Sequence, residues 1–187
     1  MENKRYFILR FGCRDKEMLF RRNDDFLAFL RIYEKRVRPF VATYAWSFTP
    51  EQALFLASTE PEDTSYTRKA DELVKRYRRY HRRRNKGQST VEKKVVHLPN
   101  PNKEDLKDTV VRIHCQPLLE GLGQDFAEYP WTSYLLLMGG KHPWLKTGEV
   151  MEWFDRKEQF MEEHHRFIDE NIGKHKSENE NFVNFKH

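Results

Sequence analysis

The order of strand-like and helix-like segments restricts the folds open to this chain of 187 residues. Apolar residues at helical spacing predict one helix after Asn23, taken as its N-cap, and another over about 65–84. Alternating β-forming residues predict strands over 4–11 (KRYFILRF), 40–48 (FVATYAWSF), 53–57 (ALFLA) and 90–98. This β-α-β-β-α-β order predicts an α+β, ferredoxin-like fold: an antiparallel four-stranded sheet with helices on one face.

Further helices are expected beyond the sheet. One should cover residues 104–115 and end before Pro117, and the others should lie around 132–138, 147–154 and 156–171. We therefore divide the chain into a ferredoxin-like domain over 1–122, a C-terminal helical extension of that domain over 123–171, and a polar tail over 172–187 that we expect to be disordered.

Residues 75–86 (KRYRRYHRRRNK) have the strongest charge bias, with eight lysines or arginines in twelve positions and no acid. Counting back from Tyr80, apolar or aromatic residues recur at Tyr77, Leu73, Ala70 and Tyr66, which is the spacing of one helix face. The cations must cover the remaining face, and this favours a polyanion partner over an ordinary solvated helix, where the signs mix. The nucleic-acid contacts predicted in this region are Lys75, Arg76, Arg78, Arg79, Arg82, Arg83, Arg84, Lys86, Lys93 and Lys94.

The overall composition is less biased than that segment. Its 34 bases and 29 acids give a net charge of +5, but the bases crowd residues 75–94, which favours a local nucleic-acid surface. Cys13 and Cys115 are too few and too far apart for a zinc site or a disulfide framework. The chain shows no signal-peptide pattern and no membrane-spanning apolar run, so we expect a cytoplasmic protein, associated with the nucleoid if it binds DNA.

Three stretches, in the same order along the chain, resemble the IS200-type transposase family, also called REP-associated or Y1 (HUH) tyrosine transposases. Residues 38–56 (RPFVATYAWSFTPEQALFL) resemble the family's strand-turn-strand ending in Met-Pro-Asn-His-x-His-Leu-Leu. Residues 111–121 (VRIHCQPLLEG) are similar to Tyr-Ile-x-x-Asn-Pro-x-x-x-Gly. Residues 128–134 (EYPWTSY) and 149–160 (EVMEWFDRKEQF) are similar to a C-terminal hallmark of the bacterial branch.

The resemblance implies a ferredoxin-like fold and a defined chemistry. In the family, a tyrosine attacks single-stranded DNA, becomes joined to the 5′-phosphate and frees a 3′-hydroxyl. Two histidines around one hydrophobic residue, with an Asn or Gln one helical turn after the tyrosine, hold a Mg or Mn ion that acts on the scissile phosphate. Strand residues i and i+2, and helix residues i and i+4, share a face, which brings these groups together.

The catalytic pattern is altered in this chain. Gln52 and Leu54 stand where the resemblance places the two histidines, Arg112 replaces the tyrosine, and only the amide remains, as Gln116. Leu54 offers no metal ligand, and Arg112 stays protonated, so it is no nucleophile at neutral pH. We therefore predict a vestigial site without a bound cofactor, close to the basic helix.

Other side chains near this site have alternative interpretations. Arg112 either holds a DNA phosphate, which adds it to the predicted nucleic-acid contacts, or pairs with Asp108 four residues earlier. Tyr77 and Tyr80 are better explained by core packing than as substitute nucleophiles. His114 could reach the vestigial site, but it lacks a partner there.

The sequence therefore predicts a transposase-like DNA-binding protein that has lost metal-dependent nicking. Its expected partner is single-stranded or hairpin DNA, with no membrane partner, and the chain is a monomer or a homodimer. Three alternatives stay open. They are a strand-cleaving transposase with a rearranged site, an RNA-binding module, and a scaffold whose basic helix docks an acidic protein.

Overall fold

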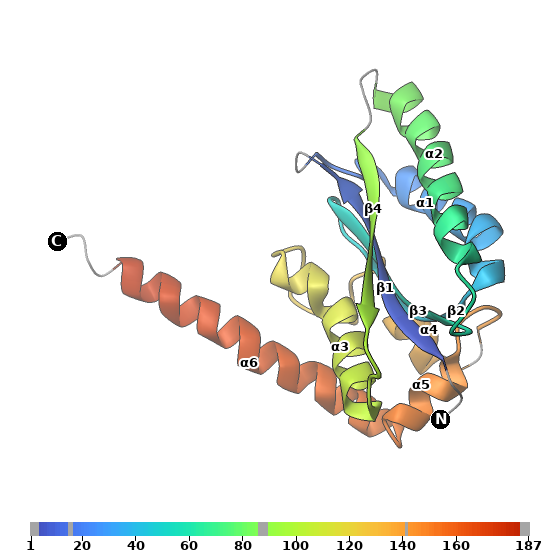
Figure 1. Ribbon diagram of the computed structural model, residues 1–187. Coiled ribbons are helices and arrows are strands. Elements are labelled where there is room, and N and C mark those ends of the chain that lie inside the picture. Colours follow the sequence, from blue (N-terminus) through green and yellow to red (C-terminus); the bar gives the residue numbers. More distant parts are fainter. Residues whose placement is uncertain (1–3, 15–16, 86–89, 141, 184–187) are drawn as a thin grey trace.

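A four-stranded antiparallel sheet forms the centre of the molecule (Figure 1). The computed structural model describes residues 4–14, 17–85, 90–140 and 142–183. The strands are β1 (Arg5–Cys13), β2 (Ala42–Phe48), β3 (Gln52–Thr59) and β4 (Val91–Leu98), in the spatial order β2-β3-β1-β4. This order and the antiparallel pairing confirm the α+β, ferredoxin-like prediction.

Two helices cover one face of the sheet. These are the crossover helices α1 (Asn23–Arg36) and α2 (Ser65–Asn85), which lie side by side in Figure 1. Their aromatic side chains pack against the sheet. The Tyr33 ring stacks on Phe55 with centroids 3.8 Å apart, and the Tyr66 ring stacks on Phe7 at 4.2 Å. Each fully buried ring contributes roughly 1.5–3 kcal/mol of transfer free energy, so this face anchors the core.

The opposite face carries the C-terminal half of the chain. Helix α3 (Lys103–Leu119) packs across β2 and β3, and α4 (Tyr134–Met138), α5 (Thr147–Trp153) and α6 (Lys157–Val183) gather around it. In Figure 1, α3 and α2 lie on opposite sides of the sheet, and α6 extends away from it. The prediction of helices on one face thus describes α1 and α2, and a second helical layer covers part of the other face.

The end of α3 differs from the prediction. The helix does not stop before Pro117 but includes it and runs to Leu119. Pro117 lies close enough to the C-terminus that only the hydrogen bond to the Ile113 carbonyl is lost. Gly121 follows the C-cap residue Glu120, and its φ of 73° is the left-handed conformation that commonly terminates helices.

Two other element boundaries also differ. Helix α1 is capped by Arg22 rather than Asn23, because the Asp25 carboxylate accepts the backbone N–H groups of Arg21 and Arg22 at 2.9 and 3.0 Å. Strand β2 begins at Ala42, since a 3-10 turn occupies Arg38–Phe40.

The C-terminal part of the chain is helical as well. Helix α6 continues to Val183, and the disordered tail expected from residue 172 stays a prediction. None of the helices in the described part of the chain combines the length and the apolar character needed to cross a membrane.

Candidate nucleic-acid interface

One face of α2 is buried, as the spacing of its apolar residues predicted. Tyr66, Ala70, Leu73 and Tyr77 are all buried against the core. The Tyr77 hydroxyl donates to the Leu19 carbonyl at 2.9 Å, which fixes the helix against the loop before α1. The other side of the helix is therefore free to face solvent.

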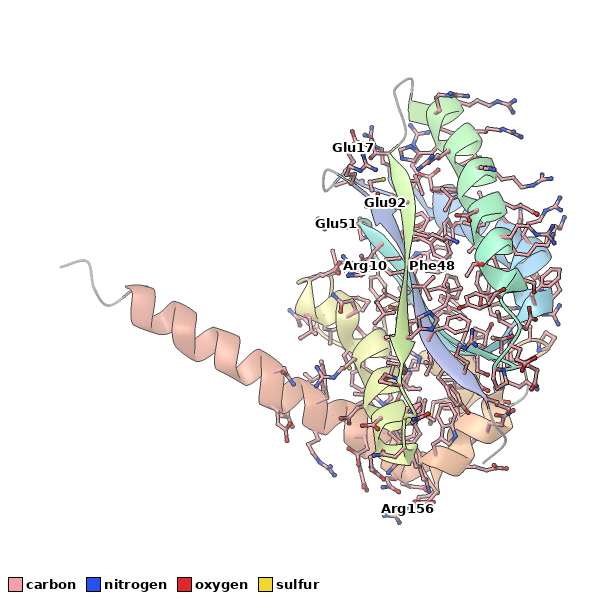
Figure 2. The ribbon with its side chains drawn as sticks, in the orientation of Figure 1. Arg10, Glu17, Phe48, Glu51, Glu92 and Arg156 are labelled. Carbon is pink, nitrogen blue, oxygen red and sulfur yellow. The ribbon has the colours of Figure 1, made fainter. Side chains whose placement is uncertain are left out.

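The outer face of α2 carries an uninterrupted group of cations. Nitrogen-tipped side chains point away from the sheet along the C-terminal half of the helix (Figure 2). At 100° per residue, five of the exposed cations share an arc of about 120° and span about 12 Å along the axis. None of them makes a hydrogen bond or an ion pair with any residue that the structure describes. This group, here called the α2 stripe, consists of Lys75, Arg76, Arg79, Arg82 and Arg83.

Three other predicted contacts already have partners. The Arg78 Nε donates to the Val91 carbonyl at 2.6 Å, and Arg84 pairs with Asp24 at 3.2 Å. The Lys93 ammonium lies 3.1 Å from Asp71 on α2. These bonds bring α2 to β4 and α1, so these side chains stabilise the fold. Lys86 lies outside the described residues.

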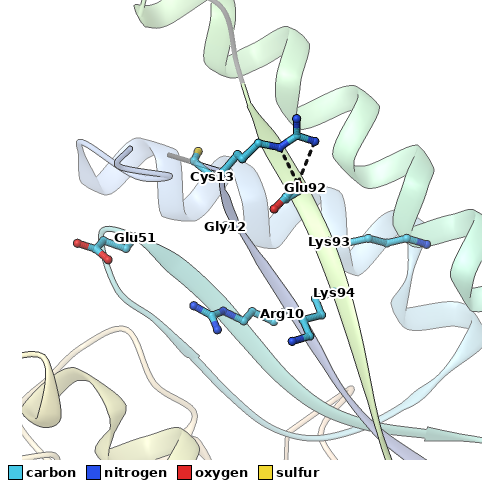
Figure 3. Close-up of a pocket in the computed structure, with 8 residues that line it drawn as sticks. Arg10, Gly12, Cys13, Glu51, Glu92, Lys93 and Lys94 are labelled. Carbon is cyan, nitrogen blue, oxygen red and sulfur yellow. Dashed lines mark hydrogen bonds and ion pairs between the residues drawn. The ribbon is translucent and has the colours of Figure 1, made fainter. Parts of the chain in front are cut away.

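The face of the sheet opposite α1 and α2 is only partly covered, and cations lie on it. Figure 3 shows Arg10 and Lys94 on the same side of β1 and β4, whereas Lys93 points to the other side, toward α2. Both Arg10 and Lys94 are exposed, and neither has an ion-pair partner among the described residues. Across β3, β1 and β4, the rows on this face read Gln52–Gly12–Glu92, Leu54–Arg10–Lys94 and Leu56–Ile8–Val96.

The pairing of Arg10 with Lys94 is unfavourable for folding. Their Cα atoms are direct partners in the antiparallel ladder, so two like charges face each other. Such a pair destabilises a sheet by roughly 0.2–1 kcal/mol. On the same face, the Glu92 carboxylate is bound by Arg14 at 3.4 Å. An anion from outside the chain would relieve the repulsion.

A hollow of about 230 Å³ lies between this part of the sheet and α3. Residues at positions i, i+3, i+4 and i+7 of α3 form one wall, and side chains of β1, β3 and β4 form the floor. Val96 is 39% exposed, so the hollow is open to solvent. This sheet–α3 hollow is lined by Ile8, Arg10, Leu54, Val96, Thr109, Arg112, Ile113 and Gln116.

The four residues of the vestigial site are close in space, but only three of them line the hollow. Leu54, Arg112 and Gln116 line the hollow, and Gln52 joins them through a residue that the sequence did not indicate. The Nε2 groups of Gln52 and Gln116 both donate to one carboxylate oxygen of Glu120, at 2.6 and 2.8 Å. The family resemblance thus identifies residues that are neighbours in space. Helix α2 lies on the opposite face of the sheet, however, so the prediction that the vestigial site is close to the basic helix was wrong.

Arg112 does not form the ion pair with Asp108 that one interpretation required. Its guanidinium lies 5.3 Å from the ring centroid of Phe167 on α6, and its side chain is exposed. A cation held over an aromatic ring stays charged and keeps its N–H donors available. Arg112 therefore remains free to bind an anion at the rim of the hollow.

Of the residues considered as substitutes for the catalytic groups, Tyr77 and His114 are packed in the core, and Tyr80 is partly buried against it. Burial raises the pKa of Tyr77, and burial together with the hydrogen bond to Asp25 raises the pKa of Tyr80 to about 12, so neither forms a phenolate readily. His114 faces away from the hollow. Its Nδ1 contacts His164 Nε2 at 2.9 Å, and its Nε2 contacts Ser133 Oγ at 2.8 Å.

The buried histidine pair forms a complete hydrogen-bond chain. His164 Nδ1 must donate to the Phe160 carbonyl, so its Nε2 accepts from His114 Nδ1, and His114 Nε2 accepts from the Ser133 hydroxyl. Burial lowers the pKa of both rings, that of His164 to about 4. The pair is neutral and joins α3 to α6 as a structural element.

Sequence reasoning missed Arg10 and Glu120. Strand alternation does place Arg10 on the face of β1 away from Leu9 and Phe11. Its pairing with Lys94, however, depends on strand register. Glu120 follows Gln116 by four residues, a helical spacing that was hidden by the prediction that the helix ends before Pro117. Both residues were therefore detectable only once the length of α3 and the strand register were known.

No family model matches this chain, and no curated protein matches it. Among solved structures, it is similar to a REP-associated tyrosine transposase bound to a REP hairpin, with a TM-score of 0.56 and 16% sequence identity. The match covers 80% of this chain and 88% of that one. At this identity the likeness shows a shared fold.

Proposed function

We propose that this chain is a transposase-like DNA-binding protein that holds single-stranded or hairpin DNA without nicking it. The α2 stripe carries the binding part of this proposal. Five exposed cations without partners on one helix face form a surface for phosphate groups, since surface cations are otherwise interspersed with acids for solubility. A solved structure that shares this fold is a transposase bound to a hairpin, which supports DNA as the polyanion.

The loss of nicking is supported by the side chains at the vestigial site. Among the residues that line the hollow, the only hydroxyl belongs to Thr109, and it donates to the Asp105 carbonyl at 2.7 Å. Arg112 supplies a fixed positive charge where the family resemblance expects a nucleophile. A site of this kind binds a phosphate but has no group to attack it.

The residues present do not fit the two-histidine metal site of the family. Leu54 has no donor atom, and Gln52 and Gln116 present their amide N–H groups to Glu120. Within the described residues, no group of three or more His, Cys, Asp or Glu side chains is placed to hold a metal ion. We therefore expect DNA binding that does not depend on Mg or Mn.

Nothing specific favours the RNA-binding alternative. RNA-binding sheets of this fold stack unpaired bases on exposed aromatic side chains. The three rows around the hollow carry aliphatic, polar and charged residues, and the Tyr6 ring on the next row lies against Tyr44 and Trp153.

Two measurements on one sample test the proposal. Fluorescence anisotropy with labelled single-stranded and hairpin DNA should show binding that weakens steeply as salt is raised. After incubation with Mg or Mn, a denaturing gel should show neither a covalent protein–DNA adduct nor a shortened strand. An adduct would restore the strand-cleaving alternative, and a flat salt response would rule out phosphate binding as the main interaction.

A further inference from the structure

We propose that the sheet–α3 hollow receives one unstacked base of single-stranded DNA, while Arg10, Lys94 and Arg112 bind the phosphates on either side of it. This inference rests on the proposed function and adds to it. It assigns the single strand to the open face of the sheet, opposite the face that carries α2.

The size of the hollow fits one base. Its volume of about 230 Å³ is below the roughly 300–1,000 Å³ of pockets that enclose whole small ligands. If one water-sized group needs about 30 Å³, the hollow has room for about eight non-hydrogen atoms, the size of a pyrimidine base. A complete nucleotide would extend out of the hollow to its rim.

The chemistry of the walls fits the face of a base. Ile8, Leu54, Val96 and Ile113 are aliphatic, so they bind the flat ring by apolar contact without reading its edge. Arg112 adds a planar guanidinium held over Phe167, and guanidinium planes stack on bases. In a duplex the ring faces are covered by neighbouring bases, so the hollow accepts only a base that has left the stack.

The charges around the hollow fit the phosphates of that strand. Arg10 and Lys94 approach from β1 and β4, and Arg112 approaches from α3 on the other side. A strand whose base enters the hollow passes between these two groups of cations. Phosphate binding also removes the repulsion between Arg10 and Lys94, so the strand compensates for a cost that the free protein bears.

The assignment to DNA comes from the proposed function, because the polar groups at the hollow do not discriminate against RNA. The Thr109 hydroxyl and the Gln116 amide are already hydrogen-bonded to Asp105 and Glu120. These bonds use donor groups, so the Thr109 oxygen and the Gln116 carbonyl oxygen remain acceptors for a ribose 2′-hydroxyl, the group by which proteins select RNA.

Two substitutions on neighbouring residues of β4 test the base pocket. Val96→Glu places a carboxylate in the hollow, whereas His97→Glu adds the same charge on the other side of the strand. Both positions are exposed, so both variants should fold, and thermal denaturation checks this. The probes are a 12-nucleotide single-stranded DNA, the same strand with abasic sites throughout, and a matched duplex.

The wild-type protein should bind the normal strand about 5- to 10-fold more tightly than the abasic strand, near the lower end of the effect of base stacking. Val96→Glu should lose this preference and at least about fivefold in single-strand affinity, and His97→Glu should keep the preference. Duplex affinity should be similar in both variants, because the α2 stripe is intact.

Equal wild-type affinity for the normal and abasic strands would overturn the base pocket, as would equal effects of Val96→Glu and His97→Glu. Salt-dependent binding would persist in either case, and the proposed function would stand. Failure of the proposed function looks different, because the wild-type protein would then bind none of the DNA probes. Tighter binding of the matching RNA strand would overturn the assignment to DNA.

Discussion

The α2 stripe makes a quantitative prediction about the salt dependence of DNA binding. Arg79 lies at its centre and Arg82 near its C-terminal end, and neither contacts another described side chain through a hydrogen bond or an ion pair. Replacing both by alanine removes two charges and keeps the helix, since alanine is the best helix former. The double variant therefore changes phosphate binding without a predicted loss of stability.

The expected effect follows from the length of the stripe. About 12 Å of helix spans three or four phosphates of a stacked strand, which rises about 3.4 Å per nucleotide. A strand long enough to reach Arg10, Lys94 and Arg112 on the opposite face of the sheet as well has about six or seven phosphates neutralised. At about −0.7 per phosphate on single strands, log affinity should fall with log salt at a slope near −4.5.

The double variant should have a slope near −3.1, because two phosphate contacts are lost. Between 50 and 200 mM salt, wild-type affinity should fall about 500-fold and that of the variant about 70-fold. Fluorescence anisotropy at five or six salt concentrations separates these values. A change at one salt concentration alone would not count, because only the slope reports the number of phosphates.

Two control variants accompany this measurement. Arg156 lies at the opposite end of the molecule from the C-terminus of α2 (Figure 2), so Arg156→Ala should keep the wild-type slope. Replacement of Arg79 and Arg82 by lysine should also keep it, since lysine neutralises a phosphate as a point charge. A slope for the alanine variant within about 0.3 of the wild-type value, against about −0.7 per phosphate, would refute phosphate binding by the stripe.

Three further predictions concern stability. Lys94→Thr removes the like-charge pair with Arg10, so the free energy of unfolding should rise by about 0.2–1 kcal/mol, with a Tm gain of up to about 4 °C, while single-strand affinity falls; a drop in Tm would contradict this. Lowering the pH from about 6.5 to 4 should cost about 3 kcal/mol through His164 alone, because its pKa is about 4 when folded and about 6.5 when unfolded. The stability is complete above the unfolded pKa and is lost as the pH falls. In urea titrations from pH 7 to 5, the free energy of unfolding should therefore fall less steeply with pH in His164→Met than in the wild-type protein. Ser133→Ala leaves His114 Nε2 and the backbone N–H of Trp46 without their partner and should cost about 1–3 kcal/mol or more in the same titrations.

The order of the elements and the orientation of α2 were predictable from local patterns. Residues 4–11 alternate in side-chain direction, so Phe7, Leu9 and Phe11 had to share one face of a strand. The apolar spacing from Tyr66 to Tyr77 likewise determined which side of α2 is buried. These features depend on helix and strand geometry over a few residues, which the sequence contains directly.

The candidate site depended on contacts between distant residues. The sequence alone established the strand and helix order, the cationic face of α2, and the absence of histidine and tyrosine at the resembling positions. Only the tertiary structure paired Arg10 with Lys94, brought Glu120 to Gln52 and Gln116, and put α2 and the vestigial site on opposite faces of the sheet. Strand register and the side on which a helix packs are decided by long-range burial and pairing, which local spacing does not record.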